Sequence, residues 1–232
     1  MKLLLFDIDG TLIRSNGAGR AAMVATLEDV FGTAGPIDDY PMNGKTDPRI
    51  ITDLLTAVGI PSTHVQEKLP AVYQLMAHKA AVIFPTKKMT TCPGVTELLT
   101  ALQKEEGMLL GLLTGNAAIT APLKLLYAGL DAGIFATGAY GSDHFDRNQL
   151  PAIAMHRATE LTGYPFTGAD TVIIGDTPAD ILCARAGQAT AVAVASGWHS
   201  AATLAKYHPD YLLDNLSNTT EVLRILMSQK EA

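Results

Sequence analysis

An apolar run near the N-terminus ends at two aspartates that are separated by a single residue. The run Leu3–Phe6 leads directly into Asp7-Ile8-Asp9-Gly10-Thr11-Leu12. In an extended chain, side chains at positions i and i+2 point to the same side, so Asp7 and Asp9 are expected to face one crevice. Two unit charges about 4 Å apart repel by roughly 4 kcal/mol at an effective dielectric constant of about 20. The pair therefore favours a bound cation.

Two further polar clusters follow apolar segments later in the chain. They are Thr114-Gly115-Asn116, after the run 108–113, and Gly175-Asp176-Thr177-Pro178-Ala179-Asp180, after the run 171–174. Short apolar runs bounded by polar turns are typical of buried parallel strands. Ligands of open α/β sheets bind beyond the carboxyl ends of the strands. We therefore expect the three clusters to form one site.

The acids of these clusters predict a metal site. Asp7, Asp9 and Asp176, together with Asp180, supply oxygen ligands alone. Such a donor set selects a hard cation, and Mg²⁺ is the natural occupant because it needs few protein ligands and retains waters.

The remaining polar residues predict a phosphate site beside the metal. Thr114 offers a hydroxyl group, and the amides of Gly115 and Asn116 are expected to donate from the N-terminus of the next helix. Arg147, in a loop before a later helix, is the predicted cation, since a guanidinium suits bidentate phosphate contact. Lys124 is the alternative; it falls within a predicted helix and is interpreted as a solvated surface residue.

A pair of carboxylates beside a metal and a phosphate can carry out phosphoryl transfer. One carboxylate can attack phosphorus, forming an aspartyl-phosphate and dividing a difficult step into two easier ones. The other can protonate the leaving oxygen and then deprotonate the attacking water. Asp7 and Asp9 supply this pair.

The elements that position these residues alternate in type over most of the chain. We predict strands at 108–113, 134–137, 171–174, 189–195 and 210–213, and helices at 93–106, 117–128, 149–162, 178–186, 201–206 and 219–228. Pro122 predicts a late start or a kink in the second of these helices. Alternating strands and helices predict an α/β fold with a doubly wound parallel sheet.

Residues 15–85 break this alternation. They contain three predicted helices, at 18–31, from Asp47 to about 58, and at 62–84, and no convincing strand. Asp47 is the predicted N-cap of the second helix, with Pro48 at its first position. We therefore predict a core domain of residues 1–14 and 86–232, interrupted by an all-helical cap domain of residues 15–85.

Composition limits the partners. The net charge of −6 argues against nucleic-acid binding, which requires many Lys and Arg contacts to phosphates, but permits a small phosphorylated molecule. Cys92 and Cys183 belong to no metal-binding pattern and are expected to be reduced, buried thiols. The apolar stretch 1–6 is too short for a signal peptide, and no segment is expected to cross a membrane. We expect a cytoplasmic protein without nucleic-acid or membrane partners; its oligomeric state stays open.

Taken in order, the motifs Asp7-Ile8-Asp9-Gly10-Thr11-Leu12, Leu113-Thr114-Gly115-Asn116 and Gly175-Asp176-Thr177-Pro178-Ala179-Asp180 resemble the signature motifs of the haloacid dehalogenase superfamily. The resemblance covers the whole chain and is strongest to phosphoglycolate phosphatase-like members with a helical cap. It implies a Rossmann-like core, a cap inserted after the first motif, and Mg²⁺-dependent phosphoryl transfer.

Position by position, the resemblance implies a role for each site residue. Asp7 resembles the nucleophile, and Asp9 the general acid/base, which also lends its backbone carbonyl to the metal. Thr114 resembles the phosphate-binding residue. Asp176 resembles the metal-ligating acid, with Asp180 as a ligand or a support. The family usually has lysine as its third motif; here no lysine lies between Lys124 and Lys206, and Arg147 occupies that interval.

The stretch Gly44-Lys45-Thr46-Asp47 resembles a cap loop that faces the active site in phosphoglycolate phosphatases and β-phosphoglucomutases. Lys45, Thr46 and Asp47 are therefore candidate specificity residues. The alternative is a helix cap followed by a surface lysine.

The leading hypothesis is a Mg²⁺-dependent phosphatase that hydrolyses a small phosphate monoester, with phosphoglycolate and sugar phosphates as candidate substrates. The alternative is a phosphomutase of the β-phosphoglucomutase type, which passes the phosphoryl group to another hydroxyl. A non-enzymatic phospho-switch is disfavoured because receiver domains lack the large helical insertion. Phosphonate hydrolysis would require a Schiff base, for which Lys45 is the candidate.

Overall fold

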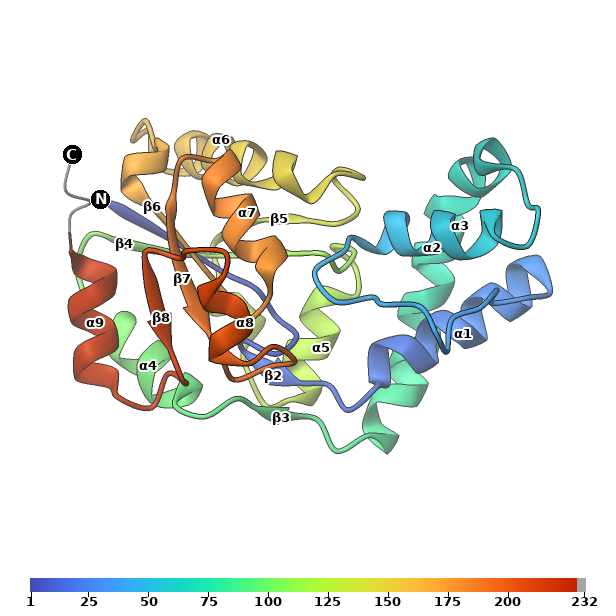
Figure 1. Cartoon of the computed structure of the whole chain (residues 1–232), viewed down its shortest axis with the longest axis horizontal. Coiled ribbons are helices and arrows are strands. Elements are labelled where there is room, and N and C mark those ends of the chain that lie inside the picture. Colours follow the sequence, from blue (N-terminus) through green and yellow to red (C-terminus); the bar gives the residue numbers. More distant parts are fainter. Residues whose placement is uncertain (229–232) are drawn as a thin grey trace.

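The computed structural model describes residues 1–228 of the 232-residue chain. A layered α/β part carries the N-terminus and the last helix, α9 (Thr219–Met227), at its outer end, and three helices form a second part beyond the opposite end (Figure 1). The second part comprises α1 (Ala18–Phe31), α2 (Asp47–Thr56) and α3 (Ser62–Ile83), and residues 18–83 are called the helical insert below.

One six-stranded sheet with strand order β5-β4-β1-β6-β7-β8 forms the centre of the core. Its strands are β1 (Lys2–Phe6), β4 (Met108–Thr114), β5 (Thr137–Tyr140), β6 (Thr171–Gly175), β7 (Thr190–Val194) and β8 (Tyr211–Leu213). Every neighbouring pair is parallel. The carboxyl ends of the strands therefore meet at the edge nearest the helical insert.

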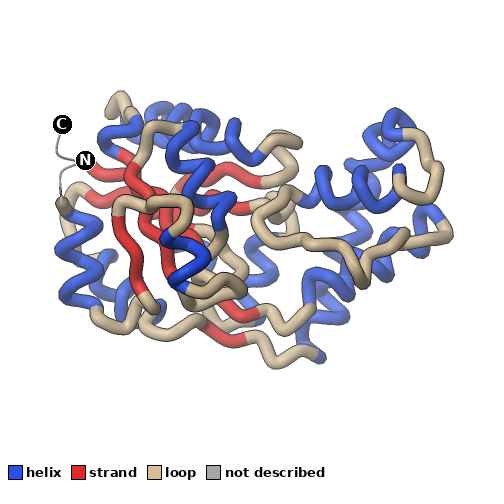
Figure 2. The backbone as a smooth tube through the Cα atoms, in the orientation of Figure 1, coloured by secondary structure: helices blue, strands red, loops and turns tan. Residues whose placement is uncertain are grey.

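Helices cover both faces of this sheet (Figure 2). Leu3 and Leu5 of β1 pack in the cluster that includes residues of α6 (Leu150–Thr162), α7 (Pro178–Ala186) and α8 (Ala201–Ala205). Leu4 and Phe6 pack in the other cluster, with α4 (Val95–Leu102), α5 (Ala121–Tyr127) and α9 (Thr219–Met227). Because adjacent strand residues face opposite sides, both sides of β1 are apolar and buried. The predicted doubly wound fold is confirmed.

The predicted helical insertion is also confirmed, since residues 15–85 contain no strand. The three helices bury apolar side chains against one another, among them Leu27, Ile51 and Val72. Gly32 ends α1 in the left-handed region, at φ 73°, which glycine adopts without strain. The predicted bounds of the two domains, 1–14 with 86–232 and 15–85, stay a prediction.

A short ribbon that the sequence did not predict joins the chain on either side of the helical insert. β2 (Ile13–Arg14) pairs antiparallel with β3 (Thr90–Thr91). Asn16 adds a side-chain hydrogen bond to the carbonyl of Lys88. Two-residue strands are too short to show periodicity, so only the pairing reveals them.

Several predicted boundaries differ from the structure. The helix predicted at 93–106 is shorter, Val95–Leu102. The helix predicted at 117–128 begins at Ala121, with Pro122 in its first turn, so the late start that Pro122 allowed is confirmed. The strand predicted at 134–137 lies at Thr137–Tyr140, because Asp131 caps a short 3-10 helix, Ala132–Ile134. The N-cap of α2 is Thr46, and Asp47 is its first helical residue.

Among residues 1–228, no helix has the length and apolar character needed to span a membrane. Cys92 and Cys183 are both buried and unpaired by disulfide, as predicted.

Candidate active site

The ends of three neighbouring strands bring the predicted clusters together. β1 lies between β4 and β6, so Asp7, Thr114 and Asp176 emerge side by side. The amide of Asp7 continues the pairing beyond the strand by donating to the carbonyl of Ile174 at 2.9 Å. A pocket of about 260 Å³ opens here, lined from the core by Asp7 and Thr114 and from the helical insert by residues that include Lys45 and Asp47.

Three buried aspartates form an acidic cluster at the base of this site. One carboxylate oxygen from each of Asp7, Asp176 and Asp180 lies within 4.8 Å of the other two. Burial, followed by the charges of Asp180 and Asp7, raises the pKa of Asp176 to about 8. Burial also raises the pKa of Asp7 to about 6, although the charge of Arg147 opposes the shift. The cluster therefore carries more negative charge than its protein surroundings neutralise.

The side chain of Asp176 is closely surrounded by backbone atoms of Gly10 and Trp198. Its Oδ2 accepts from the Trp198 amide at 3.2 Å. Gly10 has φ 89°, and a Cβ there would lie 2.3 Å from Oδ2 of Asp176. Glycine is therefore required at position 10, both by its backbone conformation and by this close approach.

Asp180 is held at the N-terminus of α7. Its Oδ2 accepts hydrogen bonds from the amide and the hydroxyl of Thr177, which is the N-cap of the helix. Its Oδ1 lies 2.5 Å from Nη2 of Arg147. Both oxygens already have protein partners, which favours the supporting role over the ligand role for Asp180.

Arg147 supplies the cation beside the acidic cluster. Its buried Nη2 lies 3.2 Å from Oδ1 of Asp7, besides contacting Asp180. Although burial disfavours the charged form, the charges of Asp180 and Asp7 raise the pKa of Arg147 above its ordinary value. Its Nε is buried and has no hydrogen-bond partner within residues 1–228, so this donor remains free for a ligand.

The acidic cluster fits a divalent metal ion. When a bound cation keeps all three carboxylates ionised, they and one guanidinium leave an excess of two negative charges for it to neutralise. The donors are all oxygen, the ligand type that Mg²⁺ prefers. The carboxylate of Asp9 lies outside this cluster, so its predicted metal contact through the backbone carbonyl stays a prediction.

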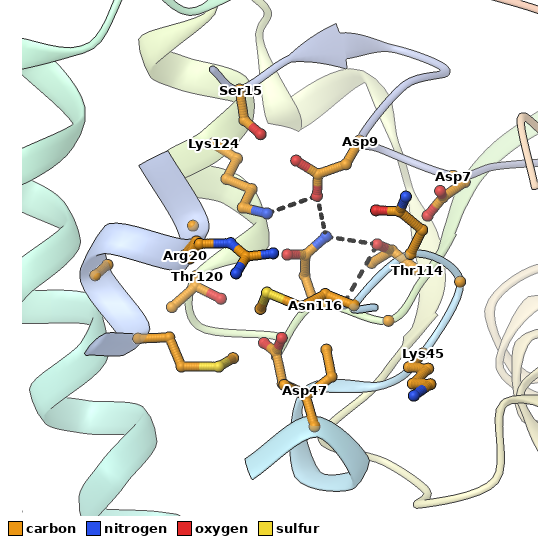
Figure 3. Close-up of a pocket in the computed structure, with 18 of the residues that line it drawn as sticks. Asp7, Asp9, Ser15, Arg20, Lys45, Asp47, Thr114, Asn116, Thr120 and Lys124 are labelled. Carbon is orange, nitrogen blue, oxygen red and sulfur yellow. Dashed lines mark hydrogen bonds and ion pairs between the residues drawn. The ribbon is translucent and has the colours of Figure 1, made fainter. Parts of the chain in front are cut away.

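Asp9 faces the helical insert instead. Its Oδ2 lies 2.5 Å from Nζ of Lys124 and accepts from Nδ2 of Asn116 at 2.9 Å (Figure 3). Burial alone would raise its pKa, but the charge and hydrogen bond of Lys124, followed by hydrogen bonds from Ser15 and Asn116, lower the pKa of Asp9 overall. Asp7 and Asp9 therefore do not share one environment.

The prediction that Lys124 is a solvated surface residue was wrong. Its side chain is buried against Asp9, and it lines the pocket. The available signal was the composition of its helix, since Lys124 is the single charged residue in the otherwise apolar segment Ala121–Tyr127. A charged side chain is rarely buried unless it is paired.

The predicted phosphate-binding turn, residues 114–116, differs from its prediction in one respect. Thr114 Oγ1 accepts from the side chain of Asn116 at 2.8 Å and from its amide at 3.3 Å. Because α5 begins only at Ala121, Gly115 and Asn116 do not form a helix N-terminus. Thr114, Gly115, Asn116 and Arg147 all line the pocket, but their binding of phosphate stays a prediction.

Residues 44–47, called the insert loop below, lie directly against this turn. The amide of Asp47 donates to the carbonyl of Gly115 at 2.7 Å, and its Oδ2 accepts from the amide of Ala117 at 2.7 Å. Thr46 donates to the carbonyl of Phe145 at 2.7 Å. A Cβ on Gly115 would lie 2.0 Å from the carbonyl oxygen of Lys45, so glycine permits this approach. Of the two alternatives, the arrangement favours a loop that faces the site.

The insert loop adds one cation and one acid to the pocket. Lys45 donates to the hydroxyl of Tyr40 at 2.8 Å. Burial raises the pKa of Asp47 to about 6, while the charge of Lys124 opposes the shift.

Sequence reasoning missed several other pocket residues, including Ser15, Arg20, Tyr40 and Thr120. Arg20, on α1, donates to the backbone carbonyls of Ile37, Asp38 and Tyr40 and so orders the segment before the insert loop. None of these residues belongs to a motif, and only the packing of the insert on the core gathers them.

Comparison with known proteins gives one family. A sequence model of the haloacid dehalogenase-like hydrolases matches residues 1–188. A phosphoglycolate phosphatase from Vibrio vulnificus is 26% identical over 97% of this chain and 97% of that protein.

Solved structures agree at the level of the fold. A hydrolase from Pseudomonas syringae superposes with a TM-score of 0.69 at 21% identity, covering 98% of this chain and 100% of that one. A protein from Bacteroides vulgatus, provisionally named β-phosphoglucomutase, superposes with a TM-score of 0.68 at 18% identity, covering 99% and 91%.

Proposed function

Since this chain belongs to the haloacid dehalogenase-like hydrolase family, we propose that it is a Mg²⁺-dependent phosphatase of a small phosphate monoester. One observation carries the proposal: a buried cluster of Asp7, Asp176 and Asp180 adjoins Arg147 at the base of a pocket. The phosphatase name of the Vibrio vulnificus relative supports the same reaction class.

In the proposed first step, the carboxylate of Asp7 attacks the phosphorus atom of the bound ester. The new bond to Asp7 forms as the bond between phosphorus and the leaving oxygen breaks, and Asp9 gives a proton to that oxygen. The proposed partners of the phosphate oxygens are Nε of Arg147, which has no hydrogen-bond partner within residues 1–228, and the hydroxyl of Thr114, which lines the pocket. Mg²⁺, held by Asp7 and Asp176 with support from Asp180, would neutralise charge on the transferred group.

In the proposed second step, a water molecule attacks the aspartyl-phosphate on Asp7. Asp9 accepts a proton from this water, the bond between phosphorus and Asp7 breaks, and inorganic phosphate is released. Asp9 serves both steps because its carboxylate lies outside the acidic cluster and faces the pocket.

The helical insert supports a small substrate. The pocket has a volume of about 260 Å³ and lies between the core and the insert loop. The insert loop is hydrogen-bonded to the predicted phosphate-binding turn. A cover of this kind excludes water while the ester is cleaved. Lys45, Thr46 and Asp47 are the proposed specificity residues, and phosphoglycolate and sugar phosphates are the candidate substrates.

A phosphomutase is the second candidate. The hydrogen bonds between the insert loop and the predicted phosphate-binding turn also favour a mutase. A mutase must keep water from the aspartyl-phosphate until a second hydroxyl of the sugar accepts the phosphoryl group. The fold alone does not separate the two outcomes, since the structures it matches bear both kinds of name.

The test is a substrate panel assayed for phosphate release with Mg²⁺ present. Phosphoglycolate, several sugar phosphates and p-nitrophenyl phosphate form the panel, and NMR follows sugar-phosphate isomerisation in parallel. We expect hydrolysis of at least one ester, and a loss on the order of 10⁴-fold in Asp7→Asn. Asp29→Asn, which changes an exposed aspartate of α1, is the matched control and should keep full activity.

No phosphate release from any ester by the wild-type protein would reject the phosphatase. Isomerisation without release would select the mutase, and retained activity in Asp7→Asn would reject the nucleophile.

A further inference from the structure

Lys124 is a buried cation at the boundary between the core and the helical insert, and it belongs to none of the three motifs. It lies on α5, and its side chain is 8% exposed. Its Nζ is 2.5 Å from Oδ2 of Asp9. Burying an ammonium group is costly unless it is paired, so a specific use for Lys124 is expected.

The two oxygens of Asp9 have different surroundings. Oδ2 receives both strong donors, Lys124 Nζ and Asn116 Nδ2. Oδ1 is buried and has no hydrogen-bond partner at normal distance within residues 1–228, although the Ser15 hydroxyl interacts with the carboxylate. Oδ1 therefore faces the Ser15 hydroxyl and receives neither of the two strong donors (Figure 3).

We propose that Lys124 is a positioning residue for Asp9. It holds the carboxylate by Oδ2, so that Oδ1 is the oxygen that gives its proton to the leaving oxygen as the bond to phosphorus breaks. The same oxygen then takes a proton from the attacking water. This role rests on the proposed phosphatase function. Lys124 lies outside the signature motifs, and the motif residue Asn116 contacts the same oxygen of Asp9 without adding a charge.

Residues of the helical insert lie close to the ammonium group of Lys124. A Cβ on Gly19 of α1 would lie 2.9 Å from Nζ of Lys124 and 3.1 Å from its Cε. Asp47 of the insert loop interacts with the same charge. The insert therefore packs over Lys124 and restricts where its ammonium group can lie, which in turn fixes Asp9.

Asn116 connects this arrangement to the phosphate-binding turn. Its Nδ2 donates to Oδ2 of Asp9 and also to Oγ1 of Thr114 (Figure 3). Lys124 and Asn116 thus hold Asp9 from two sides, one from α5 and one from the end of β4.

The test compares two esters that differ in their need for a proton. An alkyl phosphate must have its leaving oxygen protonated, whereas p-nitrophenyl phosphate releases a stabilised phenolate. In Lys124→Met we expect kcat/KM for the alkyl ester to fall about 10²-fold and that for p-nitrophenyl phosphate to fall much less. The KM for the alkyl ester should change little, because Lys124 acts through Asp9.

A double-mutant cycle with Asp9→Asn separates positioning from general support of the fold. If Lys124 acts through Asp9, adding Lys124→Met to Asp9→Asn should cause little further loss for the alkyl ester. Equal fractional losses with both esters, or additive losses in the cycle, would overturn the proposal.

Gly19→Ala tests the same idea with Lys124 retained. Alanine favours the helix more than glycine does, so this variant should fold even if Lys124→Met does not. We expect it to reduce turnover of the alkyl ester selectively, because its Cβ crowds the ammonium group; unchanged selectivity would count against the proposal. Lys79→Met, which removes a partly exposed Lys–Asp pair with a 2.6 Å contact in the helical insert, is the matched control.

The outcomes also distinguish this inference from the proposed function. If the wild-type protein hydrolyses no ester, the phosphatase itself is rejected. If Asp9→Asn shows the leaving-group dependence and Lys124→Met does not, Asp9 keeps its role and only the positioning by Lys124 is rejected.

Discussion

Asp7 and Asp9 leave the same strand end two residues apart, yet their side chains enter two different regions of the molecule. The Asp7 side chain is 7% exposed, among Asp176, Asp180 and Arg147. The Asp9 side chain is 30% exposed, beside Lys124 and under the helical insert. Burial raises the pKa of Asp7, whereas at Asp9 the effect of burial is outweighed by Lys124, and the pKa is lowered.

The difference shows how one motif supports two kinds of chemistry. On the Asp7 side, acids outnumber the cation that contacts them, which favours a divalent metal ion and a phosphate beside it. On the Asp9 side, the ammonium group of Lys124 contacts Oδ2 of Asp9 at 2.5 Å and holds the acid in place, and Asp47 interacts with the same charge.

The largest stability effect is expected on the Asp7 side. Arg147→Met leaves Asp7 and Asp180 buried without their cation, so the free energy of unfolding should fall by about 3–5 kcal/mol. Lys124→Met should cost less, about 1–3 kcal/mol, because Asp9 is partly exposed and keeps Asn116. Chemical denaturation without added metal measures both. Equal losses would contradict the contrast between the two regions.

Arg157→Met provides the control for this comparison. Arg157 pairs with Asp143 at 2.6 Å, but its side chain is 41% exposed. Exposed pairs contribute at most about 1 kcal/mol, so this variant should change the free energy of unfolding least.

Mg²⁺ binding is expected to depend on the acidic cluster around Asp7 and not on the carboxylate of Asp9. At a Mg²⁺ concentration of 100 times its dissociation constant, the folded protein should gain about 2.7 kcal/mol. Thermal unfolding with and without Mg²⁺ measures this gain. It should disappear in Asp176→Asn and persist in Asp9→Asn, whose carboxylate lies outside the acidic cluster. Loss of the gain in Asp9→Asn alone would reverse the assignment.

The effect expected at Asp47 appears as a pH dependence. Burial raises the pKa of Asp47 from its ordinary value of 3.8 to about 6. Its favourable contribution to stability is therefore fully present below pH 3.8 and is lost as the pH rises through about 6. Asp47→Asn keeps an oxygen that can accept from the Ala117 amide but carries no charge.

Urea unfolding across pH checks this prediction. Asp47→Asn should match the wild-type protein near pH 4 and exceed it above pH 7, by up to about 3 kcal/mol. A difference that does not change with pH would show that Asp47 is not buried as a costly charge. Thr46→Ala, at the neighbouring position, controls for loss of a contact between the insert loop and the core.

Much of this arrangement could be predicted from the sequence because it depends on local patterns. The apolar run before Asp7 and the turn after it specify a buried strand with two acids at its end, and the same holds for the segments before Thr114 and Asp176. Parallel strands place their carboxyl ends along one edge, so the meeting of these three clusters followed from topology alone. The three helices of the insert were likewise predicted, at 18–31, from Asp47 to about 58 and at 62–84, close to their observed bounds.

The errors arose where local pattern and tertiary packing give different answers. Lys124 was assigned to the surface because lysine is usually exposed, and nothing within seven residues of helix reveals the carboxylate that it meets. Asp9 lies 115 residues before it in the chain, and Gly19 lies on a separate helix. The late start of α5 was one of two alternatives that Pro122 left open, and the structure selects it over a kink.

The sequence by itself determined the types of reacting groups and the strand ends that carry them, because those depend on residue identity and short-range periodicity. Only the tertiary structure decided that Asp7 and Asp9 lie in different electrostatic surroundings. A carboxylate takes its pKa and its free oxygen from the charges and donors within a few ångströms of it. At Asp9 these come from α5, from the end of β4 and from the helical insert, which the chain brings together only by folding.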